Sequence, residues 1–548
     1  MGLFAIWAGS YAYYLYLLSC WLRRFWALLI LAICPRNSPM CSNPSSLMFN
    51  RYVSLAFLGW MAAASGALAQ SDEPMSAIDW LSDSISDPPP AIEPGVSDGA
   101  GVEEVRVVPL ERSHSAGIGL ISPNAAGVPA DLWGASRSDA VARAIVQLPE
   151  TLLPTLQTTL KQILIARLIP PADVVEEETS SIYRARIDRL LSKGALDEAR
   201  ALLIAADTDQ PDVFRRWFDV ALLLGEENTA CRVMRTNPDI LPTYPARIFC
   251  LARNGDWDVA ALTLGTAEAL GLLTPDEDIL LAGFLDPAIL EEEVLPPPPV
   301  RLTPLDFRLY EAVGERLQTT TLPLAFARAD LSRDNGWKIR LTAAERLTAS
   351  GALSSGELFA LYRERDPSAS GGIWERVEAV QALDRALATN GDIAAALEDV
   401  WSRFSARGLE SALAEEYAPR IALLPAPLSE TEIKVLHLAG QTTGLGDLLP
   451  DAAFREGLLN GQMPAPFDAV SRAIADGFAR STPPTRLAGL IEAGRSGEAL
   501  LRAMALLSDG ANGDLASISD GIATLRLLGF EAHARQASVE LLLQDRRG

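Results

Sequence analysis

A short unit that recurs along the chain constrains its fold more than any other feature. Each unit is a run with apolar residues at helical spacing, followed by a glycine and then by an alanine five residues after that glycine. Glycine tolerates the positive φ that ends one helix and turns into the next, and alanine lets two helices approach closely. The unit therefore predicts an all-α fold of antiparallel helical hairpins. The six pairs are Gly194 and Ala199, Gly225 and Ala230, Gly255 and Ala260, Gly391 and Ala396, Gly494 and Ala499, and Gly529 and Ala534.

The first three units are evenly spaced, because their turn glycines lie 31 and 30 residues apart. They resemble the helical hairpins of tetratricopeptide (TPR-like) proteins, which carry an aromatic residue before the turn glycine and a proline after it. The aromatic positions, eleven residues before each glycine, hold Tyr183, Phe214 and Tyr244. The proline positions, seventeen residues after it, hold Pro211, Pro242 and, in the third unit, Leu272.

The resemblance covers residues 180–272, and the spacing of later units is irregular. It departs from the family in the first helix, where the family's glycine is replaced by Ile187, Phe218 and Ile248. The resemblance implies a divergent α-solenoid of antiparallel hairpins. Such an array exposes a long concave surface that suits a protein or peptide partner.

Residues 48–69 contain the three parts of a secretory signal. Arg51 supplies a positive charge, residues 54–64 form an apolar core, and small residues occupy the positions that signal peptidase reads. Those residues are Ala67 and Ala69, so the predicted mature chain starts at Gln70. We expect an exported protein in the periplasm of a Gram-negative bacterium.

Residues 1–47 hold two further apolar runs, at residues 3–22 and 25–33, which Arg23 and Arg24 separate. About 20 apolar residues are enough to cross a bilayer, so one interpretation is a membrane-anchored protein that faces the periplasm. The other interpretation is an over-extended gene start with translation from Met48. We favour the second, because a complete signal rarely follows an unrelated spanning segment.

The charge balance bears on the partners. The chain has 70 acidic and 47 basic side chains, and four of the arginines lie in residues 1–69, which carry no acid. The predicted mature chain therefore has 43 basic against 70 acidic side chains, a net charge of −27. Such a surface repels nucleic acid and anionic headgroups and favours partners with a basic or neutral face. Lysine is scarce, and the mature chain holds only Lys161, Lys193, Lys338 and Lys434.

Composition also divides the mature chain. Residues 70–130 are rich in Ser, Asp, Pro and Gly and predict a disordered tether. Residues 131–295 predict an N-terminal helical array and residues 296–548 a C-terminal one, because a helix cannot continue through four successive prolines at 296–299.

Within the tether, one island has helical spacing. Its apolar positions are Ile78, Leu81 and Ile85, with Trp80 beside them. One interpretation is a short helix that docks into a partner's groove. The other is a segment that folds back onto its own chain.

Two cysteines, Cys231 and Cys250, follow the predicted signal, and three precede it. They fall in neighbouring predicted helices, and export to an oxidising compartment favours a disulfide between them. The alternative is a pair of buried free thiols that act as small apolar residues.

The sequence shows no strong motif for metal binding, phosphate binding or catalysis. His114, His437 and His533 share no metal-ligand spacing, and the Gly-x-Ser-x-Gly pattern at Gly95, Ser97 and Gly99 lies in the tether. The glycine-rich stretch 440–446 lacks the lysine of a phosphate-binding loop and predicts a loop between helices. We therefore expect no metal site, no cofactor and no catalytic residue.

The primary hypothesis is an exported, non-catalytic, TPR-like scaffold that binds a protein or peptide of the cell envelope. The alternative is an enzyme acting on cell-wall polysaccharide, since lytic transglycosylases carry a helical superhelix ahead of a lysozyme-like domain. That domain needs a catalytic glutamate followed by serine, and the chain has one such pair, Glu410 and Ser411. The Gly-Leu-Met-Gln stretch that should follow is missing. Membrane contact is expected only if residues 1–47 belong to the protein.

Overall fold

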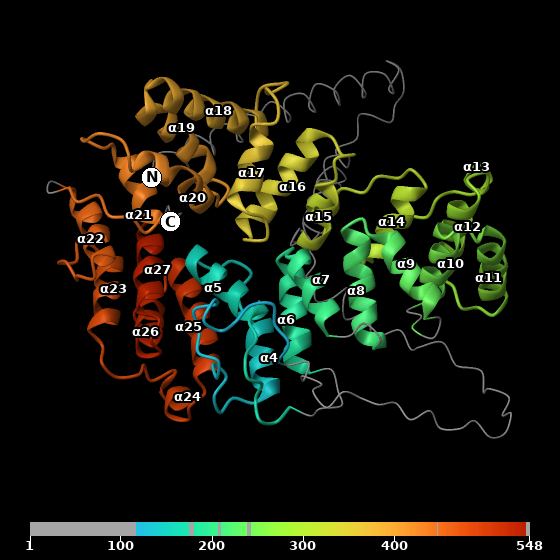
Figure 1. The fold of residues 1–548 in the computed structure, drawn as a ribbon, viewed down its shortest axis with the longest axis horizontal. Coiled ribbons are helices and arrows are strands. Elements are labelled where there is room, and N and C mark those ends of the chain that lie inside the picture. Colours follow the sequence, from blue (N-terminus) through green and yellow to red (C-terminus); the bar gives the residue numbers. More distant parts are fainter. Residues whose placement is uncertain are drawn as a thin grey trace, which may run out of the picture. The chain divides into compact units, whose positions relative to one another are not determined.

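The computed structural model describes residues 117–174, 180–206, 210–237, 240, 243–445 and 448–543. These residues form 24 α-helices, labelled α4 to α27, and contain no β-strand, so the predicted all-α class is confirmed (Figure 1). All of them belong to Pro74–Gly548, one of the two units into which the chain divides. The segment 1–47, the signal with Ala67, Ala69 and Gln70, the docking-helix candidates from Ile78 to Ile85, and His114 lie outside the described residues.

The helices follow one another with short connections. The first group is α4 (Ser138–Val146), α5 (Pro154–Ile165), α6 (Ser181–Ser192), α7 (Leu196–Ala205), α8 (Pro211–Leu223), α9 (Glu227–Thr236), α10 (Tyr244–Arg253), α11 (Trp257–Ala269), α12 (Pro275–Leu285), α13 (Ile289–Glu292) and α14 (Pro304–Ala312). Two 3-10 helices follow, η4 (Thr319–Thr321) and η5 (Leu324–Phe326).

The second group begins with α15 (Ala327–Asp330), α16 (Trp337–Ala349), α17 (Ser355–Tyr362), α18 (Ile373–Thr389), α19 (Ile393–Ser405), α20 (Glu410–Ile421) and α21 (Glu430–Leu438). It ends with α22 (Pro450–Leu459), α23 (Ala469–Ala479), α24 (Ala488–Glu492), α25 (Ser496–Ala511), α26 (Leu515–Leu527) and α27 (Glu531–Leu543). None of the described helices is both long and apolar enough to cross a membrane.

Local sequence sets where many helices begin. In a capping box, the side chain of the capping residue accepts a hydrogen bond from the N–H of the third helical residue. The side chain of that third residue in turn accepts a hydrogen bond from the N–H of the capping residue. The cap residues of this kind are Thr274, Thr303, Ser354, Ser429 and Asp468. Helix α4 lacks such a cap, because it begins at Ser138 after Arg137, whose side chain makes no capping hydrogen bond. The Ser138 N–H and hydroxyl donate instead to the Asp173 carboxylate, at 2.9 and 3.1 Å.

The recurring glycines end helices as their sequence position suggests, with one exception. Gly194, Gly225, Gly255, Gly494 and Gly529 have φ between 70° and 89°. In the unit at Gly391 the positive φ of 50° falls on Asn390, because asparagine also tolerates the left-handed region. The partner alanines are fully buried at Ala199, Ala230, Ala260, Ala499 and Ala534, and Ala396 is half-buried.

The described helices close on themselves, which the sequence did not lead us to expect. α25 packs on α4, and α27 packs on α5, so helices from the two ends of the described chain are neighbours (Figure 1). Ala135 N–H donates to Gly494 O at 3.0 Å, and Ser508 Oγ donates to Thr151 O at 2.7 Å. The circuit runs from α6 through η5, α15, α16, α17, α20 and α21 to α27 and α5.

Helices α9 to α13 form an arm outside this circuit. The arm leaves the circuit at α8, and within it α10 packs on α12. Helix α14 then packs on both α12 and α8, so the chain returns to the place where the arm began. Tyr310 of α14 donates its hydroxyl to Pro296 O at 3.0 Å, so the proline segment is held against the helices that follow it. One buried hydrophobic cluster extends from both sides of this segment to α25–α27, and a second comprises buried residues of α15–α21.

The structure joins Cys231 of α9 to Cys250 of α10 by a disulfide, with their Cα atoms 4.9 Å apart. Both cysteines are buried, with exposed fractions of 0% and 3%. The bridge therefore fixes the second helix of one predicted unit to the first helix of the next, at the base of the arm.

Replacing both cysteines by alanine is expected to lower the free energy of unfolding by about 3 kcal/mol, because the bridge closes a loop of about 20 residues. Urea denaturation of the two proteins measures the difference. Intact mass after alkylation without reductant provides the control. Full alkylation of the wild-type protein under that condition would contradict the bridge.

A second prediction concerns Glu540 of α27, which accepts hydrogen bonds from the Thr155 N–H and hydroxyl of α5, at 3.0 and 2.6 Å. Burial raises the pKa of Glu540 from 4.5 to about 7, despite these bonds. The folded state thus favours the neutral acid, which adds to the free energy of unfolding. This contribution is complete below about pH 4.5 and is lost as the pH rises to about 7. Glu540→Gln should lessen the fall in unfolding free energy between about pH 5 and about pH 8, by at most about 3 kcal/mol.

Urea denaturation at both pH values tests this, with Glu531→Gln on the exposed side of α27 as the matched control. The pKa of Asp219, which burial also raises to about 7, affects all three proteins alike and cancels in the comparison. An unchanged pH dependence in Glu540→Gln would contradict the account of this contact.

Candidate functional site

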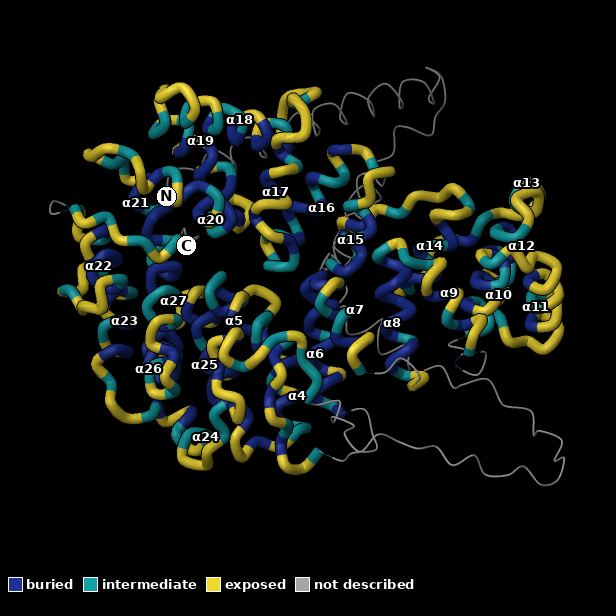
Figure 2. Tube along the Cα trace, in the orientation of Figure 1, coloured by how far each residue is buried: buried dark blue, intermediate teal, exposed yellow. Residues whose placement is uncertain are grey.

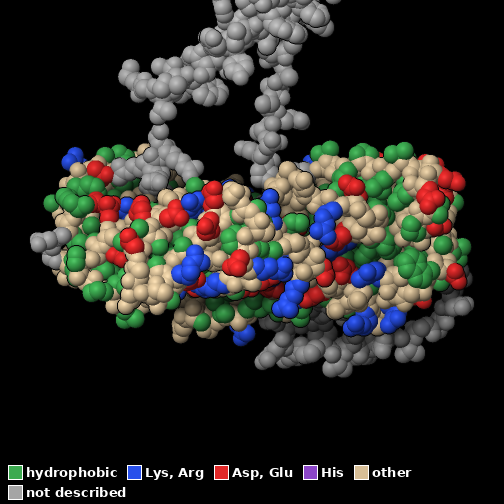
Figure 3. All heavy atoms as spheres, turned by 90° about the horizontal axis from the view of Figure 1, so that it is seen from above, with side chains coloured by type: hydrophobic (Ala, Val, Ile, Leu, Met, Phe, Trp, Pro, Cys, Tyr) green, Lys and Arg blue, Asp and Glu red, His purple; other side chains and the backbone are tan. Residues whose placement is uncertain are grey.

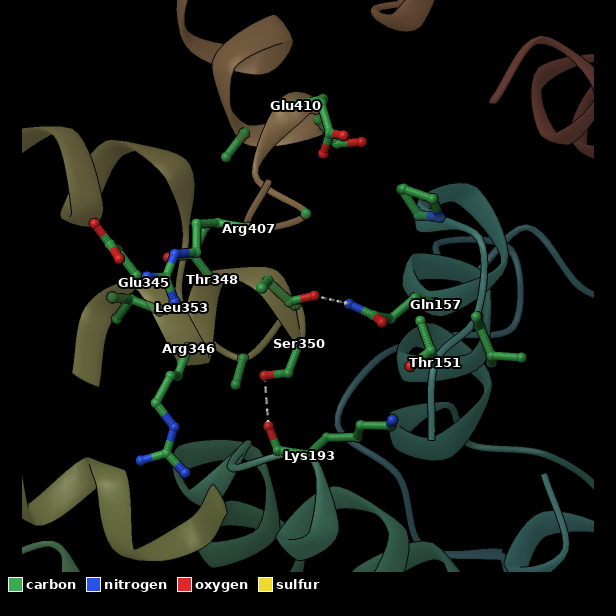
Figure 4. Close-up of a pocket in the computed structure, with 18 of the residues that line it drawn as sticks. Thr151, Gln157, Lys193, Glu345, Arg346, Thr348, Ser350, Leu353, Arg407 and Glu410 are labelled. Carbon is green, nitrogen blue, oxygen red and sulfur yellow. Dashed lines mark hydrogen bonds between the residues drawn. The ribbon is translucent and has the colours of Figure 1, made fainter. Parts of the chain in front are cut away.

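A cavity of about 1770 Å³ lies inside the closed circuit of helices. Its walls come from α5 and the end of α6, from α16 and the start of α18, from the α19–α20 connection, and from α25 to α27. Figure 4 shows part of this wall, with Glu410 of α20 and Lys193 at the end of α6 on opposite sides of the view. Helices far apart in the sequence thus supply a single site.

The turn at Gly194 brings two parts of this wall together. A Cβ at Gly194, where φ is 75°, would lie 2.5 Å from the Leu347 side chain of α16. Only glycine fits this approach, which places the end of α6 against α16. Ser350 Oγ donates to Lys193 O at 2.8 Å, and Gln157 Nε2 donates to Ala349 O at 3.3 Å (Figure 4). The first predicted turn therefore also helps to build the site.

One wall carries a cluster of charges in which Arg189 and Lys193 are buried and Glu150 is exposed. The Lys193 ammonium lies 3.1 Å from the Glu150 carboxylate, which also pairs with Arg189 at 3.1 Å. Burial, and then the positive charge of Arg189, lower the pKa of Lys193 to about 8. Lys193 therefore still carries its charge at neutral pH but loses it at a lower pH than an ordinary lysine does.

The facing wall holds a buried ion pair. Arg376 of α18 donates from Nε and from its terminal nitrogen to both oxygens of Glu345 in α16, each at 2.7 Å. The Tyr362 hydroxyl donates to the same carboxylate at 2.6 Å. Burial and the adjacent Glu345 raise the pKa of Tyr362 well above its ordinary value, so the hydroxyl remains a donor. This pair fixes the start of α18 at the cavity.

The cavity differs in charge from the acidic chain as a whole. Its cationic side chains are Lys161, Lys193, Lys338, Arg346, Arg376 and Arg407. Its carboxylates are Glu150, Glu345, Glu410, Glu415 and Glu540. Lys338 and Arg407 are exposed and form no salt bridge among the residues that the structure describes. The site thus offers two cationic groups to an occupant.

Sequence reasoning missed this cavity, although one signal pointed to it. Three of the four lysines after the predicted signal, Lys161, Lys193 and Lys338, line the cavity. The fourth, Lys434, pairs with Glu430 within α21 at 2.6 Å. In a chain that uses arginine elsewhere, this clustering of a rare residue was the available clue.

Most residues singled out from the sequence lie elsewhere. None of the six turn glycines lines the cavity, although Gly194 lies between the lining residues Lys193 and Ala195. The disulfide lies at the base of the arm. Glu410 and Ser411, the pair weighed for the enzyme alternative, do line the cavity. The described residues contain no group of histidine, cysteine and acidic side chains arranged to hold a metal ion.

His437 belongs to a separate buried network that anchors the loop after α21. Arg455 Nε donates to His437 Nδ1 at 3.3 Å, so the opposite nitrogen, Nε2, carries the proton that is shared with Glu456 at 2.8 Å. Burial lowers the pKa of His437, which keeps the ring neutral. Glu456 also accepts the N–H groups of Thr443 and Gly444, at 2.9 and 3.0 Å. The described part of the glycine-rich stretch is therefore a structural loop.

Comparisons with protein-family models, with curated proteins and with solved structures return no match to this chain.

The ion pair in the cavity wall gives a prediction. Arg376→Met leaves the Glu345 carboxylate buried without its cation and should lower the free energy of unfolding by about 3–5 kcal/mol. Arg365→Met is the matched control, because the Arg365 side chain is 64% exposed and its pair with Glu364 contributes about 1 kcal/mol or less. Urea denaturation compares the variants, and equal stability of the two would contradict the role assigned to Arg376.

Proposed function

We propose that the protein is an exported, non-catalytic scaffold of the cell envelope that binds a segment of a protein partner in its central cavity. The observation that carries the proposal is the cavity itself. Its volume of about 1770 Å³ exceeds the range of about 300–1,000 Å³ that small-molecule sites occupy. An extended peptide of several residues is the kind of occupant that needs such a space.

The lining supports a peptide more than a uniform apolar ligand. Polar side chains such as Thr151, Gln157 and Asn512 alternate with apolar ones such as Leu353 and Trp401. A peptide carries a backbone donor and an acceptor at each residue, which such groups can satisfy. Lys338 and Arg407 add cationic partners for its carbonyl or carboxylate oxygens. The TPR-like resemblance of residues 180–272 points to the same class of function.

The cell-wall enzyme remains the second candidate because Glu410 lies in the cavity wall. A glutamate at this place could serve as the acid of glycoside cleavage if a saccharide occupied the same space. The two candidates therefore share one site and differ in what enters it.

The proposal predicts that filling the cavity abolishes partner binding. Ala349→Trp places a large side chain on an exposed lining position, whereas Ala532→Trp places it on the exposed face of α27 away from the cavity. After crosslinking in cells that make the protein, a protein partner should be recovered with the wild type and Ala532→Trp but not with Ala349→Trp.

Equal recovery with all three proteins would contradict the cavity as the binding site. Purified protein incubated with cell-wall material tests the alternative. Release of soluble fragments that Glu410→Gln abolishes would overturn the scaffold in favour of the enzyme.

A further inference from the structure

Helix α11, on the arm, is apolar on the side that faces solvent. Val259, Leu262 and Leu270 are 50%, 72% and 64% exposed, and their spacing places them on one face of the helix. Figure 2 shows α11 as largely exposed, in contrast to α6 and α8. We call the residues Val259, Leu262, Thr263, Thr266 and Leu270 the α11 face; Thr263 is partly buried and the other four are exposed.

The two threonines make this face more apolar than its sequence suggests. Thr263 Oγ1 donates to Val259 O at 2.7 Å, and Thr266 Oγ1 donates to Leu262 O at 2.8 Å. With their hydroxyls bonded inside the helix, both residues can present methyl groups outward. The face therefore offers a continuous apolar stripe along a helix of 13 residues.

The opposite side of α11 is already used for packing. Its buried residues are Ala260 and Ala267, whose small side chains let α11 lie close to its neighbours α10 and α12. At one edge, Trp257 contacts Phe284 of α12, with ring centroids 6.3 Å apart. The arm is thus packed on one side of α11, and no described part of the chain covers the α11 face.

The segment that carries this face is strongly acidic, although α10, which packs on α11, contributes Arg247 and Arg253. Residues 254–300 contain ten acidic side chains and no lysine, arginine or histidine. In Figure 3 hydrophobic and acidic side chains lie together at the end of the molecule that carries α11 to α13 in Figure 1. The acidic residues are Asp256, Asp258, Glu268, Asp276, Glu277, Asp278, Asp286, Glu291, Glu292 and Glu293.

We propose that the α11 face is a second interaction surface, which docks a cationic amphipathic helix of a partner protein. An apolar stripe with a rim of carboxylates complements a helix whose apolar residues lie between lysines and arginines. The apolar contact supplies affinity, and the acidic rim selects the sign of the partner's charge and its orientation.

Charge also decides among other occupants. The segment around Ile78 and Leu81 of this chain is amphipathic, but it carries Asp79 and Asp83 and no basic residue from 70 to 105. Like charges would oppose its docking here. Anionic lipid and nucleic acid are disfavoured for the same reason. A cationic helix is the occupant that both the apolar and the charged features fit.

The test uses the full chain and a synthetic peptide of leucine and lysine with leucines at positions i, i+3, i+4 and i+7. Binding measured by fluorescence anisotropy should weaken about tenfold or more in the double variant Val259→Gln, Leu262→Gln, because two apolar contacts that the bound peptide would bury are lost. Replacing Glu291, Glu292 and Glu293 by Gln should weaken binding and reduce its dependence on salt. Leu423→Gln, at a site that is 85% exposed elsewhere, should bind as the wild type does.

Three results would overturn the proposal. The first is equal binding of a scrambled peptide of the same composition, which would indicate unspecific attraction. The second is unchanged binding after the substitutions at Val259 and Leu262. The third is competition by a peptide of residues 75–87, or binding of phosphatidylcholine vesicles that these substitutions abolish, since either would identify a different occupant.

The inference goes beyond the proposed function and fails separately from it. Ala349→Trp fills the cavity and should leave peptide binding at the α11 face unchanged. Conversely, the substitutions at Val259 and Leu262 should leave any partner of the cavity bound. A loss in only one of these assays therefore shows which of the two proposals is wrong.

Discussion

Contact between helices from the two ends of the described chain is the constraint on which the rest of the structure depends. α4 and α5 pack on α25 and α27, and the buried Glu540 carboxylate meets the first turn of α5 at Thr155. A series of helical hairpins could otherwise continue as an open superhelix. Because these helices meet, the space inside the circuit is surrounded by helices and becomes a cavity that is open to solvent, and the arm of α9 to α13 is left outside it.

The cavity and the arm differ in electrostatic character. The cavity is lined by three of the four lysines among the described residues, and its wall holds the buried pair of Glu345 with Arg376. The arm carries carboxylates and no cation from residue 254 to residue 300. A scaffold with two sites of unlike charge can hold two unlike partners, which is the arrangement that the two proposals together describe.

Sequence reasoning reached the local structure because glycine, proline and capping residues act over a few positions. Five of the six turn glycines have positive φ, and Asn390 takes that role beside Gly391. The pairing of Cys231 with Cys250 could also be predicted from the sequence, since the two residues lie only 19 positions apart in neighbouring helices. The contact between the two ends of the described chain could not be predicted, because Thr155 and Glu540 are 385 residues apart and neither residue differs in type from many others in the chain. The cavity depends on that closure and could not be predicted without it.

The closure is tested most directly by a disulfide across it. The Cβ atom of Ala135 lies 4.0 Å from the position that a Cβ at Gly494 would occupy, which is within the range that disulfides span. Cysteine at position 494 has to adopt a φ of 70°, which costs roughly 1–2 kcal/mol. In the folded protein carrying Ala135→Cys and Gly494→Cys, the account predicts a bridge between these positions under mild oxidation, detected by intact mass and peptide mapping. Two free thiols at these positions in the folded protein would contradict the closed arrangement.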